Sequence, residues 1–194
     1  VELALGAMAA GGVLGSVIAR RVQMTQMPEL VAAMHSLVGM AAVLIAVAIT
    51  INPTAFNVAY PIPTGNRIEL FVGTFVGAIT FSGSVIAFGK LAGLGKYSRL
   101  FSSAPVAFRG QHVLNLGLAI VMLVAGVQFL NAAPASQWPA FARLTAVAFL
   151  LGVLLIIPIG GADMPVVISM LNSYSGIAGG MTGFVIRNEE LIIA

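Results

Sequence analysis

The stretch LVAAMHSLVGMAAVLIAVAITI, residues Leu30–Ile51, decides the fold class of this chain. It holds 22 residues and is apolar apart from His35, Ser36 and Thr50. At about 1.5 Å of rise per residue, a helix of this length spans the hydrocarbon core of a bilayer. An ionisable side chain is expensive to bury there, and imidazole changes its charge near neutral pH. His35 is therefore a candidate proton carrier; the alternative is that it only packs.

The composition of the whole chain fits the same class. The 194 residues are 59% hydrophobic and 8% charged, with a mean hydropathy of +1.05, whereas soluble domains carry about 25% charged residues. The net charge of +3 comes from cations between apolar runs, which the positive-inside rule explains better than nucleic-acid binding. Because the sequence has no cysteine, disulfides and thiolate metal sites are excluded. We expect an integral membrane protein surrounded by lipid, with no nucleic-acid partner.

The apolar runs predict an all-α, polytopic transmembrane helix bundle with about six spans. We expect one transmembrane domain over residues 1–194, with spans at 3–19, 30–51, 68–88, 113–130, 141–159 and 166–186. The connections are short and rich in turn-forming residues, so no soluble domain fits between two spans. The chain begins at Val1 without an initiator methionine and stops inside the apolar run 191–194. We therefore expect a fragment that is truncated at both ends.

The charges of the loops predict an orientation. Six spans leave alternating loops on opposite sides, with six cations on one side and three on the other. The positive-inside rule places the richer side in the cytoplasm or its topological equivalent. The first group is Arg20, Arg21, Lys90, Lys96, Arg99 and Arg109, and the second is Arg67, Arg143 and Arg187.

Three polar residues are predicted at one depth below the cytoplasmic surface. His35 and Asn172 follow the cytoplasmic ends of their spans by five and six residues, and Ser84 precedes Lys90 by six. All three then lie about 8–9 Å below the surface and could share a cavity that relays protons or holds water. For Ser84 and Asn172, the alternative is a purely structural hydrogen bond between helices.

The spans that carry His35 and Asn172 share a local pattern. Met27-Pro28 precedes His35 by the same spacing with which Met164-Pro165 precedes Asn172. A proline near a helix start fixes φ and needs no hydrogen-bond partner for its nitrogen. Glycines at four-residue spacing, such as Gly11 with Gly15 and Gly73 with Gly77, predict close helix contacts.

Two acidic residues have alternative interpretations. Asp163, between a Gly-Gly pair and Met164-Pro165, either caps the last span or contacts a cytoplasmic partner. Glu69 is solvated or paired with Arg67, or else it forms the outer mouth of a pathway. The sequence holds neither a Gly-x-Gly-x-x-Gly motif nor a P-loop, and His35 and His112 have no metal-ligand spacing. We expect no catalytic, cofactor-binding or metal-binding residue within this fragment.

Three segments together resemble a known family: Arg21–Ser36, Phe81–Leu91 and Gly160–Gly176. They are similar to the membrane domain of the beta subunit of proton-translocating NAD(P)⁺ transhydrogenase, an oxidoreductase and translocase. The resemblance implies that His35, Ser84 and Asn172 match the proton pathway of that family. It also implies that Asp163 matches an acidic residue at the cytoplasmic face, near the NADP(H)-binding domain, and that Glu69 matches an acidic residue of the third helix.

The resemblance also implies cofactors and partners. NAD and NADP would bind soluble domains of the complete enzyme, so this fragment would hold no hydride-transfer site of its own. The partners would be the alpha subunit and the NADP-binding domain of the beta subunit, in a dimer of alpha–beta units. The location would be the bacterial inner membrane or the mitochondrial inner membrane. The alternatives are a proton- or cation-coupled secondary transporter and a structural scaffold.

Overall fold

The computed structural model describes residues 2–193, which form α-helices joined by turns and short 3₁₀ helices, with no β-strand among them. The α-helices are α1 (Glu2–Arg21), α2 (Met27–Ile51), α3 (Thr64–Leu91), α4 (Gln111–Leu130), α5 (Gln137–Ile156), α6 (Met164–Ile186) and α7 (Glu189–Ile193). The 3₁₀ helices are η1 (Met24–Gln26), η2 (Pro53–Phe56), η3 (Leu94–Lys96), η4 (Arg99–Phe101), η5 (Pro134–Ser136) and η6 (Gly161–Asp163). The predicted all-α helix bundle is confirmed.

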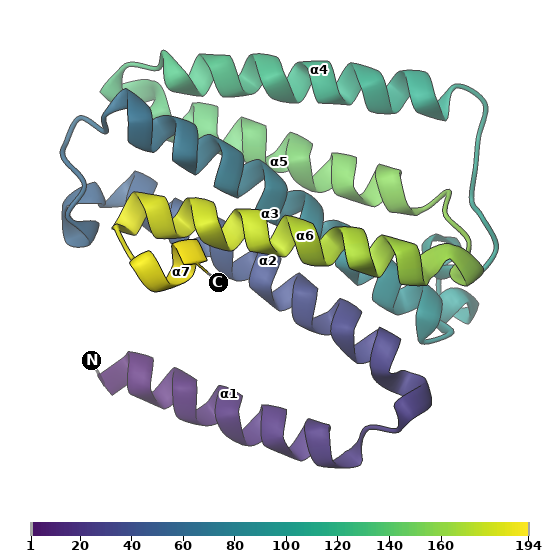
Figure 1. The fold of residues 1–194 in the computed structure, drawn as a ribbon. Helices are drawn as coiled ribbons and strands as arrows, with labels where there is room; N and C mark the ends of the chain where they lie inside the picture. Colours follow the sequence, from purple (N-terminus) through teal and green to yellow (C-terminus); the bar gives the residue numbers. More distant parts are fainter. Residues whose placement is uncertain (1, 194) are drawn as a thin grey trace.

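Helix α3 lies at the centre of the bundle. It packs against α2, α5 and α6, while α4 lies along α5 and also contacts α3 at the end where α4 finishes (Figure 1). Helix α1 lies apart, and none of its described residues is buried. Polar side chains on α3 are therefore surrounded by protein, whereas α1 presents its apolar surface outward.

Five helices, α1 to α5, are long and apolar enough to cross a membrane. Helix α6 has 23 residues, a comparable length, but it is not one of these five. Each of the six expected spans overlaps one of the helices α1 to α6. That α6 is the sixth span, and that residues 1–194 form one transmembrane domain, stay predictions.

The bundle has two ends, which we name by the helices that begin and end there. Helices α2 and α6 begin at the inner end, where α3 and α5 finish, and the opposite end is the outer end (inner end at the right in Figure 1). Both α2 and α6 start with a methionine followed by a proline, Pro28 and Pro165, in the first turn. Because the first-turn nitrogens have no partner within a helix, proline is accommodated there without loss.

Glycines bring α2 and α3 into backbone contact. A Cβ atom placed on Gly39 would lie 2.6 Å from the Gly77 carbonyl oxygen and from the Phe81 nitrogen, so no larger residue fits. The predicted close contact at Gly77 is confirmed. At Gly11 and Gly15 of α1 the prediction is wrong for the described chain, because nothing lies within 4 Å of either. A small-residue pair permits a close contact but does not supply the neighbour.

Candidate functional site

A hydrogen bond joins His35 of α2 to Asn172 of α6. The Nε2 atom of His35 lies 2.9 Å from Oδ1 of Asn172, and His35 is only 8% exposed. With its proton on Nε2, the imidazole donates to the amide oxygen. Each residue stands eight positions after the methionine that starts its helix, and both helices begin at the inner end. Equal distance along two parallel helices places the two side chains at one level, as the sequence predicts for this pair.

Most hydroxyls buried in the bundle are satisfied within their own helix. Thr80, Thr145 and Thr182 each donate to the carbonyl four residues earlier. Four buried side-chain atoms have no partner among the described residues: His35 Nδ1, Thr74 Oγ1, Ser84 Oγ and Asn115 Oδ1. Buried polar atoms in native proteins are nearly always paired with protein or water. The unbonded Nδ1 of His35 is therefore a position where water or a proton can bind.

Ser84 lies in the interior of α3 but is not hydrogen-bonded to the pair. Its side chain is 0% exposed, and within residues 2–193 its Oγ has no partner. The structure thus brings His35 and Asn172 together and leaves Ser84 as a separate unsatisfied donor. That these three residues share a proton pathway stays a prediction. Depth along a helix gives the level of a side chain, but not the direction in which the helix turns it.

Asp163 stands at the N-cap position of α6, at the end of η6. Its side chain makes no capping hydrogen bond, and the residue is exposed at the inner end. The Asp163 nitrogen donates to the Gly160 carbonyl at 3.1 Å, a bond that belongs to η6. The expected N-cap position of Asp163 is confirmed, but its side chain forms no cap, and its carboxylate is free to meet a partner outside the described residues.

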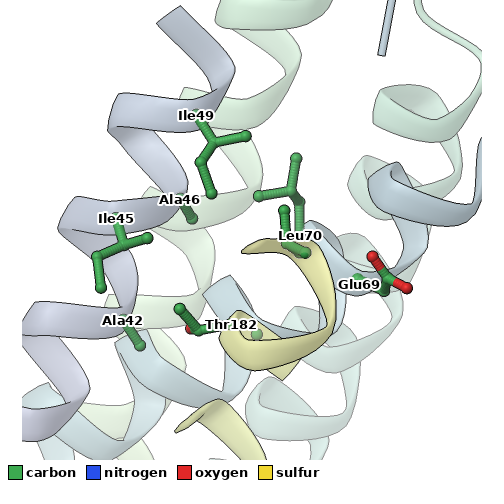
Figure 2. A pocket seen from close by; sticks show the side chains of 9 residues that line it. Ala42, Ile45, Ala46, Ile49, Glu69, Leu70 and Thr182 are labelled. Carbon is green, nitrogen blue, oxygen red and sulfur yellow. The ribbon is translucent and has the colours of Figure 1, made fainter. Parts of the chain in front are cut away.

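Glu69 lies near the outer end of α3, beside a small pocket between α2, α3 and α6. The pocket, about 10 Å³ and so about the size of one water, is lined mainly by apolar residues of these helices, with Glu69 and Thr182 as its polar members. Figure 2 shows the Glu69 carboxylate directed away from the apolar side chains of Ile45 and Ile49. The carboxylate accepts a hydrogen bond from the Asn66 amide at 3.1 Å.

Arg67 is not the partner of Glu69, so that suggested pairing is corrected. Its guanidinium donates instead to three carbonyl oxygens, of Ile62 at 2.8 Å and of Leu130 and Ala132 at 2.9 Å each. The last carbonyls of a helix have no partner within the helix and attract cations. Arg67 therefore stabilises the end of α4, and Glu69 keeps Asn66 as its bonded neighbour.

Lys90 is a residue whose role the sequence analysis missed. The sequence groups Lys90 with the loop cations, but its side chain is 1% exposed and binds backbone carbonyls at the inner end. The signal available in the sequence is its position within the apolar run Phe88–Leu91 rather than in a polar loop. Thr74, 0% exposed with an unpartnered hydroxyl in the middle of α3, is the second missed residue.

These features define a class: an integral membrane helix bundle in which a buried imidazole is hydrogen-bonded between two parallel helices. Among residues 2–193, no group of three His, Cys, Asp or Glu side chains could hold a metal ion. A family model, NAD(P) transhydrogenase beta subunit, matches residues 1–194. The chain belongs to this family.

Relatives agree with the family model. The NAD(P) transhydrogenase subunit beta of Rhodospirillum rubrum is 56% identical over 190 residues, which cover 97% of this chain and 39% of the relative. The subunit from a designated strain of the same species matches with the same identity and coverage. The chain therefore spans well under half the length of these relatives.

Proposed function

We propose that this chain is the proton-conducting part of the membrane domain of NAD(P)⁺ transhydrogenase. It would couple proton translocation to hydride transfer between NAD(H) and NADP(H) in soluble domains. The observation that carries this proposal is the buried His35–Asn172 hydrogen bond, which leaves the second ring nitrogen without a partner in the described chain. The family membership gives no support to the alternative of a cation-coupled transporter.

The chemistry of the pair follows from the two ring nitrogens of His35. The neutral imidazole donates from Nε2 to the Asn172 amide and can accept a proton at Nδ1. Protonation makes both nitrogens donors, and because the Asn172 amide oxygen is too weak a base to take the Nε2 proton, the transported proton would enter and leave through Nδ1 by way of water. Asn172 fixes the ring orientation and hence the tautomer. Ser84, with its free hydroxyl one helix away, supplies a further donor for ordered water on this path.

Coupling requires that a proton at His35 favours one of two states of the protein. Asn172 belongs to α6, and α6 begins directly after Asp163. A changed hydrogen bond at Asn172 would shift α6 and thereby move the exposed Asp163 carboxylate against the NADP(H)-binding domain. Glu69, partly exposed near the outer end, is the candidate outer mouth of the same path.

The cofactor sites belong outside this chain. Dinucleotide-binding folds place the pyrophosphate at a glycine-rich turn between a β-strand and a helix. Residues 2–193 form only helices and turns, so they do not fit NAD or NADP, and we derive no step of hydride transfer through them. The proposed partners are the alpha subunit and the NADP-binding domain of the beta subunit, in a dimer of alpha–beta units. The proposed location is the bacterial inner membrane or its mitochondrial equivalent.

The test uses the complete enzyme reconstituted in proteoliposomes, with proton uptake and hydride transfer measured together. His35→Ala should abolish proton pumping, because no other described side chain replaces the imidazole. Ser36→Ala is the matched control, because within residues 2–193 the Ser36 hydroxyl bonds only to the Ala33 carbonyl of its own helix, at 2.7 Å. Normal pumping by the His35→Ala enzyme would overturn the proposal.

A further inference from the structure

Lys90 is a fully buried cation near the end of α3. Lysine is almost never fully buried without a partner, yet Lys90 is 1% exposed. Its Nζ atom donates to the carbonyl of Ile157 at 2.9 Å and to that of Ser102 at 3.0 Å, with Ala104 at 3.5 Å. All of these acceptors are backbone oxygens, so the main chain rather than any side chain binds the ammonium group.

The acceptors come from two separate segments. Ile157 is the C-cap residue of α5, and the oxygens at a helix C-terminus carry partial negative charge that favours a cation. Ser102 and Ala104 belong to the loop between α3 and α4. Burying an ammonium group is costly unless its donors are satisfied, so the loop must stay folded over α5 for Lys90 to remain inside.

Backbone hydrogen bonds extend this arrangement to the start of α6. Ser103 Oγ donates to the Lys90 carbonyl at 3.2 Å, and the Ser103 carbonyl accepts from the Gly161 nitrogen at 2.8 Å. The Val106 nitrogen also donates to the Ile157 carbonyl at 3.1 Å. Gly161 opens η6, the turn that carries Asp163 and leads into α6. We call Lys90, residues 102–106, Ile157 and Gly161 the Lys90 clamp.

We propose that Lys90 is a positioning residue that makes the loop after α3 and the turn before α6 move as one body. A displacement of α6, the helix that carries Asn172, would then also displace Asp163 and the loop after α3 at the inner end. Without the clamp, α6 could shift while the loop stayed behind. This inference rests on the proposed function for its consequence, but the clamp itself can be tested independently of proton transport.

The first measurement reports the clamp alone. A Cβ atom on Gly161 would lie 3.5 Å from the Ser103 Cβ, within the range of a disulfide, and the sequence has no cysteine of its own. In the complete enzyme, the Ser103→Cys/Gly161→Cys pair should oxidise readily. Adding Lys90→Met should slow disulfide formation by about tenfold, because a segment that is no longer held opens more often.

Controls separate the clamp from general loss of charge or of fold. Lys96→Met removes an exposed lysine of the same loop, which lies over the Tyr97 ring, and should leave the disulfide rate unchanged. Should Lys90→Met fail to accumulate, Lys90→Gln keeps two N–H donors without the charge and should also slow the reaction. A Lys90 variant that forms the disulfide at the parental rate would overturn the inference.

The second measurement is rescue of coupling. Lys90→Met should lower the number of protons translocated per hydride transferred, and the 103–161 disulfide should restore it by replacing the lost clamp with a covalent bond. Failure of the disulfide to restore coupling, or loss of coupling when the disulfide is formed with Lys90 intact, would overturn the inference. If His35→Ala pumps normally, the proposed function fails, while the disulfide rates still decide whether Lys90 holds the loop.

Discussion

At the scale of single residues, two buried hydroxyls of α3 differ in their hydrogen bonding. Ser82 and Ser84 lie two positions apart and are both buried, at 6% and 0% exposure. The Ser82 hydroxyl donates to the Ala78 carbonyl of its own helix at 2.9 Å, whereas Ser84 Oγ has no partner in residues 2–193. An unsatisfied buried hydroxyl costs stability, so its presence at Ser84 suits a donor to water in a transport path.

Ser84→Ala separates these roles. Removing an unsatisfied hydroxyl should leave the thermal stability of the enzyme unchanged or raise it, by up to about 1 kcal/mol. The coupled rate of hydride transfer should nevertheless fall by about tenfold or more, since a proton donor is lost. Ser82→Ala is the control and should keep the parental coupled rate. Parental rates in both variants would show that Ser84 is structural.

At the scale of the helices, the crossing of α2 and α3 holds His35 at its level. Gly39 stands one turn beyond His35, and its Cα faces the backbone of Gly77 and Phe81. Gly39→Ala should push the two helices apart and destabilise the protein by about 1–3 kcal/mol, the usual cost of overpacking. The thermal unfolding of the solubilised enzyme would report this as a lower midpoint.

Gly11→Ala is the matched control for that substitution. Gly11 also lies within an apolar helix, but no atom of residues 2–193 outside that helix lies within 4 Å of the position of a Cβ. Because alanine favours helix over glycine, this change should be neutral or slightly stabilising. Equal midpoints for the Gly39→Ala and Gly11→Ala enzymes would contradict the close crossing of α2 and α3.

The sequence predicts some properties of the helices better than others. Apolar runs predict the all-α class, and equal spacing from two Met-Pro starts predicts that His35 and Asn172 share a level, because rise per residue is constant. The spacing of residues does not show toward which side a helix turns a side chain, or which segment of the chain covers it. Ser84 therefore lies at the predicted depth but is not hydrogen-bonded to the His35–Asn172 pair. Lys90 has the sequence pattern of a loop charge, but the folded chain buries it against backbone carbonyls.

At the scale of the whole molecule, the charged loops predict that the inner end faces the cytoplasm. Tyr97, in the loop after α3, is 74% exposed at the inner end, and Ser136, in η5, is exposed at the outer end. Because the sequence has no cysteine, Tyr97→Cys and Ser136→Cys give single labels in this part of the enzyme. An impermeant maleimide should label position 136 in intact cells and position 97 only in inverted vesicles. Labelling of both from one side would contradict this topology.

The central claim is that His35 and Asn172 act as one relay between proton flow and the soluble domains. Residues that act as a unit have non-additive effects when both are removed. Coupled proton uptake per hydride should therefore be measured in proteoliposomes for His35→Ala, Asn172→Ala and the double variant. Ser173→Ala, on the next residue of α6, is the control.

We predict that Asn172→Ala alone and the double variant lose as much coupled activity as His35→Ala, because either substitution breaks the path through the pair. Substantial coupled proton uptake by the Asn172→Ala enzyme, beside none by the His35→Ala enzyme, would contradict the account.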